Sequence, residues 1–130
     1  MKAIFVDSDV LIDVLRQVPL AIATLELAKR QAPLTVSVVV RMETVVGSSN
    51  RESLQRTERL LTRMQLVPLS EAISEIADAL VTRFYLSNGL KIADALIAAT
   101  AIVHDVPLLS KNQRDFQYIP GLKLLPYPVA

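Results

Sequence analysis

The stretch FVDSDVLID, residues 5–13, places three carboxylates within seven positions directly behind an apolar run. The residues from Lys2 to Val6 predict a short buried strand, and Asp7, Asp9 and Asp13 crowd the point where that strand ends. Like charges held close together repel one another. The pattern therefore indicates that the negative charge at this place in the fold has a functional role.

The composition predicts one packed domain, residues 1–130, because 52% of the residues are hydrophobic and 21% are charged. A net charge of +1 provides no overall field for nucleic acid or membrane, so any basic site must be local. The absence of cysteine excludes disulfides, thiolate nucleophiles and cysteine-ligated zinc. Asp7 and Asp9 interrupt any signal peptide, and the longest apolar stretch, 95–103, is far below the roughly 20 residues of a membrane span. We expect a cytoplasmic protein with no membrane contact.

Apolar runs alternate with segments of helical period, which predicts an α/β fold with a mainly parallel sheet of four to five strands. The expected strands are residues 2–6, 34–38, 66–68, 107–109 and 122–125. The expected helices are residues 9–16, 19–31, 39–46, 51–65, 71–88 and 91–104. In the third of these helices, Val39, Met42 and Val46 fall on one stripe, which predicts its buried face.

Four acidic residues stand in apolar surroundings that should limit their solvation: Asp7, Glu43, Asp94 and Asp115. Sites in open parallel sheets form beyond the carboxyl ends of the strands. Asp7 and Asp115 follow strands directly or by a loop, and Glu43 lies about a turn into the helix after the second strand. Asp94 follows a helix, so its place at this edge is an assumption.

Each carboxylate also has a structural explanation. Asp94 could complement its helix dipole, Glu43 could be an edge residue, and Asp7 and Asp115 could bond nearby backbone amides. If the four converge, protons or a cation must offset their repulsion, and oxygen ligands select a hard ion such as Mg²⁺ or Mn²⁺. Zinc is disfavoured, because the single histidine, His104, lies ten residues beyond Asp94 on the same helix.

Four blocks of the sequence occur together in one known family. They are Asp7-Ser8-Asp9; Ser37 with Glu43 and Gly47; 92–101; and 109–112 followed by Asp115-Phe116. In this order and spacing they resemble the PIN-domain family, and in particular the VapC-like toxin ribonucleases of prokaryotic toxin–antitoxin pairs. Thr44 stands where leucine is usual, and Ser110 where threonine is commoner.

The resemblance implies a three-layer α/β/α sandwich and an endoribonuclease dependent on Mg²⁺ or Mn²⁺. Its metal-binding catalytic residues would be Asp7, Glu43, Asp94 and Asp115. Ser8 and Asn112 would orient these ligands, and Asp9 would add a water-mediated contact. The partners implied are an RNA substrate, a cognate antitoxin protein and a second copy of the chain.

Basic residues flank the proposed ligands in sequence. Lys91, Lys111 and Arg114 are the candidates for contacts with RNA phosphates, although each could equally be an ordinary surface cation. A stripe of three arginines in the segment 51–65 predicts a solvated face, or a surface that extends the RNA path or contacts an antitoxin.

Two other functions fit part of the pattern. Asp7 and Asp9 also match the first motif of haloacid-dehalogenase-like phosphatases, with Asp7 as nucleophile, but that family expects a hairpin flap where residues 10–15 indicate a helix. A catalytically silent PIN scaffold would keep the fold without the chemistry, although such scaffolds usually lack some of the acidic residues. RNA cleavage that requires added Mg²⁺ separates an enzyme from a scaffold.

Overall fold

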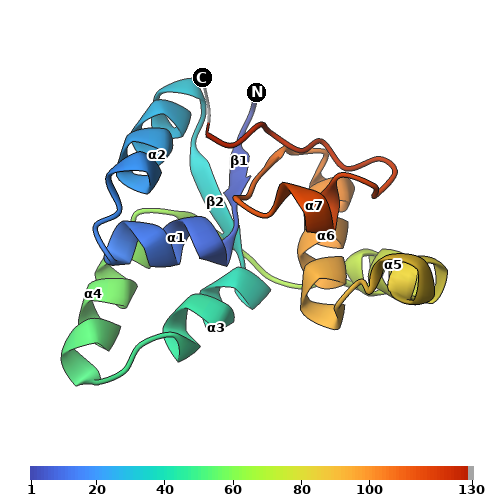
Figure 1. The fold of residues 1–130 in the computed structure, drawn as a ribbon, viewed down its shortest axis with the longest axis horizontal. Coiled ribbons are helices and arrows are strands. Elements are labelled where there is room, and N and C mark those ends of the chain that lie inside the picture. Colours follow the sequence, from blue (N-terminus) through green and yellow to red (C-terminus); the bar gives the residue numbers. More distant parts are fainter. Residues whose placement is uncertain (129–130) are drawn as a thin grey trace.

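The computed structural model describes Met1 to Pro128 and contains a parallel sheet with helices on both sides (Figure 1). Its strands are β1 (Ile4–Val6), β2 (Leu34–Ser37), β3 (Gln65–Val67) and β4 (Leu108–Leu109). Its helices are α1 (Ser8–Leu15), α2 (Pro19–Gln31), α3 (Val38–Val46), α4 (Arg51–Leu61), α5 (Glu71–Asn88), α6 (Ile92–His104) and α7 (Gln113–Phe116). In Figure 1, α1 and α2 lie on one side of the strands and α5 and α6 on the other. The predicted three-layer α/β/α architecture is confirmed.

The sheet has the order β3-β2-β1-β4, and every neighbouring pair is parallel. Phe5 of β1 pairs with Thr35 of β2 on one side and with Leu108 of β4 on the other. After β1 the chain therefore builds the sheet first in one direction and later in the opposite one. The carboxyl ends of β1 and β4 border this switch point, which is where open parallel sheets form their sites.

Polar side chains cap the starts of α1, α3, α4 and α5. Ser37 accepts a hydrogen bond from the Val40 amide at the start of α3, and Ser70 accepts one from the Ile73 amide at the start of α5. At the other end of α5, Gly89 adopts a left-handed conformation with φ of 67°. Glycine takes this conformation without steric cost, so the chain can turn sharply into α6.

The core is built on the central strands and on α6. Ile4, Val6, Leu108 and Leu109 are fully buried, as expected for strands covered on both sides. The buried side chains of α6 are mostly small, namely Ala95, Ile97, Ala98, Ala99, Thr100 and Ala101. Small side chains allow this helix to approach its neighbours closely. No helix within residues 1–128 is long and apolar enough to cross a membrane.

The predicted buried stripe on α3 is wrong. Met42 is 52% exposed and Val46 is 82% exposed, and the buried residues of α3 are Val39, Val40 and Thr44. Thr44 can be buried because its hydroxyl donates to the Val40 carbonyl at 2.7 Å. The helix therefore turns a polar residue inward and leaves two large apolar side chains on the surface.

The predicted fifth strand, residues 122–125, does not form within the described chain. Only Leu124 pairs with the sheet, as an isolated parallel bridge to Leu108. Two hydrogen bonds flank this bridge, from the Leu108 amide to the Lys123 carbonyl and from the Leu125 amide to the Leu108 carbonyl. The next residue is Pro126, which has no amide hydrogen with which to extend the ladder. The sheet accordingly has four strands.

Candidate active site

The carboxyl ends of β1 and β4 bring two buried polar side chains together. Asp7 directly follows β1 and is 5% exposed, and Ser110 directly follows β4 and is fully buried. The Ser110 hydroxyl donates to Asp7 Oδ2 at 2.7 Å, and the Ser8 amide donates to Asp7 Oδ1 at 2.8 Å. The same hydroxyl lies 3.4 Å from Asp9 Oδ2, so its single proton favours the shorter contact with Asp7. Both oxygens of Asp7 are thus oriented.

Glu43 joins this edge from α3. The Ser8 hydroxyl, in the first turn of α1, donates to Glu43 Oε1 at 3.0 Å. This bond fixes one oxygen of Glu43 near the start of α1 and leaves the other available. Ser8 therefore touches two of the four predicted acidic residues, one through its amide and one through its hydroxyl.

Asp94 and Asp115 complete the group from α6 and α7. The pKa of Asp94 is raised to about 6, first by burial and then by the negative charges of Glu43, Asp115 and Asp9, whereas Lys91 acts in the opposite direction. Asp94 consequently lies within electrostatic range of carboxylates from three other helices. The Asn112 amide donates to Asp115 Oδ2, which orients that side chain. The position of Asp94, which the sequence left as an assumption, is beside the other acidic residues.

The same crowding changes Asp7 and Asp9. The pKa of Asp7 is raised to about 7, mainly by burial and also by the charges of Asp9 and Asp94, while the bonds from Ser110 and Ser8 act in the opposite direction. Burial also raises the pKa of Asp9. The ion pairs formed within residues 1–128, Lys111–Asp13 and Lys123–Asp105, include none of the four predicted ligands. The site therefore favours either bound protons or a cation.

The donor set suits a hard divalent ion. Among residues 1–128, no three acidic or histidine side chains lie close enough together to hold a metal ion by themselves. Mg²⁺ commonly binds through one or two carboxylates and keeps several water molecules, so it does not need such a cage. Oxygen-only donors and the raised pKa values of Asp7 and Asp94 fit this kind of ion, because its charge would relieve the repulsion between them.

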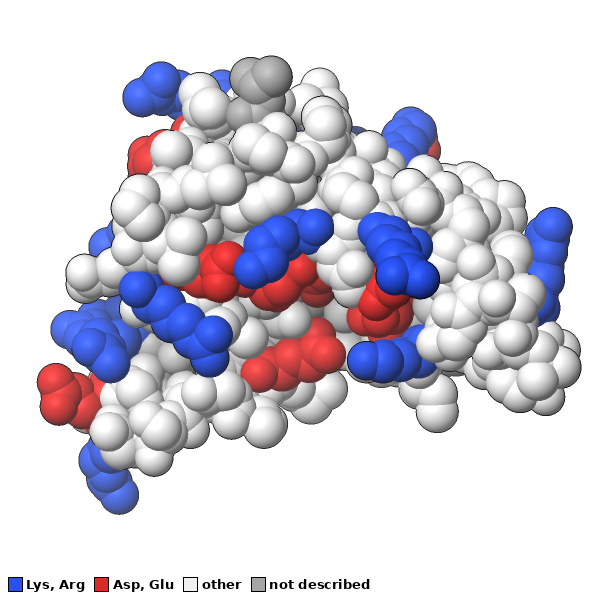
Figure 2. Space-filling view, viewed as in Figure 1, with Lys and Arg blue, Asp and Glu red and all other residues white. Residues whose placement is uncertain are grey.

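Basic side chains border the acidic residues. Figure 2 shows acidic atoms across the middle of one face, over the region where α1, α3, α6 and α7 meet in Figure 1, with lysine and arginine side chains on both sides. Lys91 is the residue before α6, and Arg114 adjoins Asp115 on α7. The Lys111 Nζ atom lies 2.8 Å from Asp13 Oδ2, and the backbone amide of Lys111 donates to Asp9 Oδ1. All three predicted basic residues are therefore near the acidic group.

Three residues near the site were not predicted. The sequence could have identified Ser110, since this residue follows β4 directly just as Asp7 follows β1. Asp13, one of the three carboxylates that follow the first strand in the sequence, is half-buried and paired with Lys111. Burial and the charges of Asp115 and Asp94 raise the pKa of Tyr118, which therefore lies near both carboxylates. No feature of the sequence marked Tyr118.

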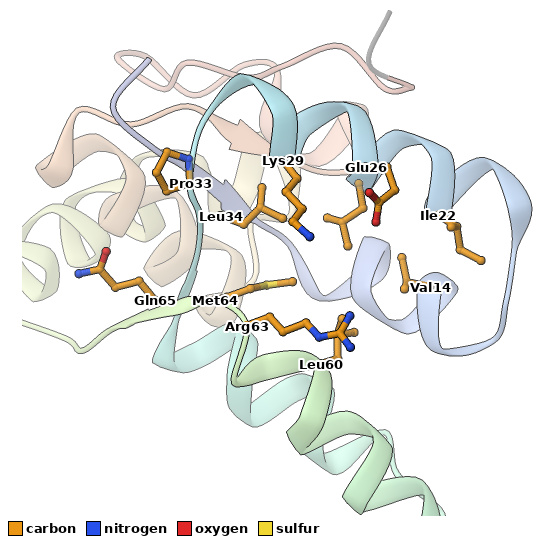
Figure 3. Close-up of a pocket in the computed structure, with 11 residues that line it drawn as sticks. Val14, Ile22, Glu26, Lys29, Pro33, Leu34, Leu60, Arg63, Met64 and Gln65 are labelled. Carbon is orange, nitrogen blue, oxygen red and sulfur yellow. The ribbon is translucent and has the colours of Figure 1, made fainter.

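A second concavity lies between α2 and α4, away from the acidic group (Figure 3). This groove has a volume of about 580 Å³. Apolar residues form most of its lining, with Glu26, Lys29 and Arg63 adding charge. Val14 of α1 also lines it, and its sequence neighbour Asp13 is the partner of Lys111. Helix α1 thus connects the groove with the acidic site.

Acidic side chains lie near one another at the switch point of a parallel α/β/α sandwich. A group of oxygen ligands in this place is typical of proteins that hydrolyse their substrates. The chain belongs to the PIN domain family, whose model matches residues 4–122. It is 38% identical to Ribonuclease VapC10 of Mycobacterium tuberculosis over 121 residues, which cover 92% of this chain and 90% of that protein. It is 34% identical to Ribonuclease VapC19 of the same organism over 120 residues, 91% of this chain and 95% of that protein.

A solved structure agrees with these sequence relationships. The structure described as a toxin-antitoxin complex from Klebsiella pneumoniae superposes with a TM-score of 0.80 and 32% sequence identity. The match covers 98% of each chain. The similarity in fold therefore extends over almost the whole length of both chains.

Proposed function

We propose that this protein is a metal-dependent endoribonuclease and the toxin of a toxin–antitoxin pair. The observation that carries the proposal is that the charges of Glu43 and Asp115 act on Asp94, and the charge of Asp94 acts on buried Asp7, at the carboxyl edge of the sheet. The naming of two relatives of similar length as ribonucleases supports the reaction class. A cytoplasmic location stays a prediction from the absence of cysteine.

The arrangement of residues in the site suits hydrolysis of a phosphodiester by water. Asp7, Glu43, Asp94 and Asp115 would hold Mg²⁺ or Mn²⁺ directly or through its water molecules, with Asp9 contributing through water. Such an ion, when bound, lowers the pKa of a water molecule and offsets charge on the leaving oxygen. Ser110, Ser8 and Asn112 hold Asp7, Glu43 and Asp115 in fixed orientations, so little ordering remains to be done when substrate arrives.

Other chemical groups are poorly placed for the reaction. His104 is at the opposite end of α6 from Asp94 and packs edge-on against Phe5, with ring centroids 5.9 Å apart. A phosphatase of the haloacid-dehalogenase type would require a hairpin flap after Asp7, but α1 begins at Ser8. The proposal therefore uses carboxylates and water alone.

Removal of the metal should abolish activity. Purified protein should cleave RNA in the presence of Mg²⁺, lose cleavage in excess EDTA, and recover it when Mg²⁺ is added back. Gel analysis of a mixed RNA sample measures this. Cleavage that resists EDTA would contradict the metal dependence, and an absence of cleavage under all metal conditions would favour a catalytically silent scaffold.

The basic residues should act mainly through RNA binding. Replacing both Lys111 and Arg114 with alanine should weaken binding and reduce the slope of log affinity against log salt by roughly 1.4, because about 0.7 is lost for each phosphate contact in a single strand. Cleavage at saturating RNA should fall less than affinity. Lys91 is proposed to make a further contact of the same kind.

A charge-matched control is available at the other end of the strands. Lys2 precedes β1 and Arg30 is near the end of α2, and both are exposed. The Lys2→Ala/Arg30→Ala variant loses the same net charge and should retain the wild-type salt slope. An equal change in both double variants would mean that only net charge matters.

We also propose that an antitoxin covers the acidic site and fills the groove between α2 and α4 (Figure 3). Helix α1 contributes to both places, so one extended partner segment could reach from the groove to the site. An apolar stretch suits the groove lining, and a basic side chain suits the carboxylates. The similar Klebsiella pneumoniae structure is a toxin-antitoxin complex, which supports a partner of this kind.

A homodimer is proposed from the apolar surface. Val46 of α3 is 82% exposed and Leu86 of α5 is 83% exposed, so both helices offer apolar surface that a second copy of the chain could cover. Light scattering at tens of micromolar should give about twice the chain mass of 14.3 kDa. The Val46→Lys/Leu86→Lys variant should be monomeric, whereas Leu20→Lys, an exposed position on α2, should stay dimeric. A monomeric wild type would contradict the proposal.

A further inference from the structure

A small polar recess adjoins the acidic site between the end of α5 and α7. Its volume is about 270 Å³, and it is lined by Ser87, Asn88, Arg114, Asp115, Gln117 and Tyr118. Asp115 belongs both to this recess and to the group of carboxylates. Anything bound in the recess would therefore lie directly beside the proposed reaction centre.

Neutral hydrogen-bonding groups dominate the lining. The Ser87 hydroxyl donates to Asn88 Oδ1 at 2.7 Å, which orients the Asn88 amide. The bond from Ser87 occupies only the oxygen of the Asn88 side chain, and Gln117 adds a second amide group to the lining. Asn88 and Gln117 are both exposed, so their amide groups are accessible to a ligand from solution.

The aromatic ring of Tyr118 is held in place by its neighbours. It packs against Phe84, with ring centroids 5.0 Å apart and an interplanar angle of 59°. The guanidinium of Arg83 lies 4.9 Å from the centroid of the Phe84 ring. A ring supported in this way loses little freedom when a second planar group contacts it, which favours binding of an aromatic ligand.

We propose that this recess binds the base of a nucleotide next to the scissile phosphate, with Asn88 and Gln117 reading its edge. The inference rests on the proposed ribonuclease activity and specifies how its substrate is selected. Proteins recognise single-stranded RNA by contacting unstacked bases with aromatic rings and by hydrogen bonds to the base edges. Amide side chains are suited to this, because they offer a donor and an acceptor side by side.

The chemistry of the recess favours a base over a phosphate. Asp115 places a carboxylate on its wall, which would repel an anion, whereas a neutral base carries no such penalty. Arg114 can hold the phosphate of the same nucleotide at the edge of the recess. The volume is just below the roughly 300–1,000 Å³ of pockets for drug-sized ligands, which suits one base and not a duplex.

Cleavage of a randomised RNA library tests the assignment. The 5′ ends of the fragments give the preference at each position around the cut, and the Asn88→Ala/Gln117→Ala variant is compared with wild type. We expect the preference at one position adjacent to the cut to fall by roughly tenfold, the order expected for one lost amide–base pair. Preferences at other positions should remain. Gln55→Ala, an exposed glutamine on α4, serves as the control and should keep the wild-type pattern.

The outcomes distinguish failure of base selection from failure of the nuclease proposal. If the double variant cuts with an unchanged pattern while Asp94→Asn is inactive, the recess does not select a base but the nuclease proposal stands. If wild type cuts no RNA, both proposals fail. A uniform loss of cleavage at every sequence would also overturn base selection, because it would assign Asn88 and Gln117 a role in general RNA binding.

Discussion

Replacing Asp94 with asparagine should reduce Mg²⁺-dependent RNA cleavage by roughly 100-fold or more, since even changes to groups behind a metal ligand cost 10–100-fold. The substitution keeps the shape of the side chain and removes one charge from the acidic group. Asp94 experiences the charges of Glu43, Asp115 and Asp9, so the loss of its charge changes its interaction with all three. Cleavage assays at matched RNA and Mg²⁺ concentrations measure the loss.

Melting curves distinguish a metal ligand from a helix-dipole residue. In EDTA, Asp94→Asn should be at least as stable as wild type, because one like-charge repulsion has been removed. Mg²⁺ at a hundredfold excess over its dissociation constant should stabilise wild type by about 2.7 kcal/mol and the variant by much less. A residue that only complements the helix dipole would give the reverse: modest destabilisation, retained cleavage and equal responses to Mg²⁺.

Asp78→Asn provides a matched control for this comparison. Asp78 is an exposed residue in the middle of α5, and its loss changes the net charge by the same amount. Its cleavage rate and its response to Mg²⁺ should equal those of wild type. Retained activity in Asp94→Asn would contradict the assignment of Asp94 to the site.

The fold could be predicted because its strongest signals are local. β1 and the helix α6 are almost continuously apolar, and Ser70 and Gly89 mark the two ends of α5. The prediction failed where tertiary contacts determine which face of a helix is buried. On α3 the apolar residues Met42 and Val46 face outward while Thr44 is buried, since its hydroxyl is satisfied within the helix. Hydrophobic period alone does not decide which face of a short helix is buried.

The candidate site could be predicted in part for a similar reason. Asp7, Glu43, Asp94 and Asp115 each stand out against apolar neighbours, and the switch point of the sheet explains why such residues meet. Tyr118 carries no comparable signal. Its proximity to Asp94 and Asp115 depends on how α7 packs beside α6, which is a property of the folded chain.

The stability of the metal-free protein should fall as pH rises, which is opposite to the behaviour of a salt-bridged aspartate. Burial raises the pKa of Asp7 from 3.8 to about 7, so between these values the folded state binds a proton that the unfolded state has released. Stability declines wherever the folded state binds more protons. A difference of about three pKa units corresponds to about 4 kcal/mol between pH values below 4 and above 7. Asp94 adds a smaller effect of the same sign, because solvent screens it more.

Urea unfolding in EDTA at about pH 5, 6, 7 and 8 measures this decline, and Asp7→Asn should remove most of it. Asp105→Asn is the control, because Lys123 lowers the pKa of Asp105 and its contribution has the opposite sign. Saturating Mg²⁺ should flatten the decline in wild type, since a cation favours the ionised carboxylates and competes with the protons. Stability that rises from pH 5 to pH 8 without metal would mean that Asp7 is ionised when the site holds no cation. The folded chain would then have another way to neutralise its carboxylates, and the need for a cation, which supports the metal proposal, would disappear.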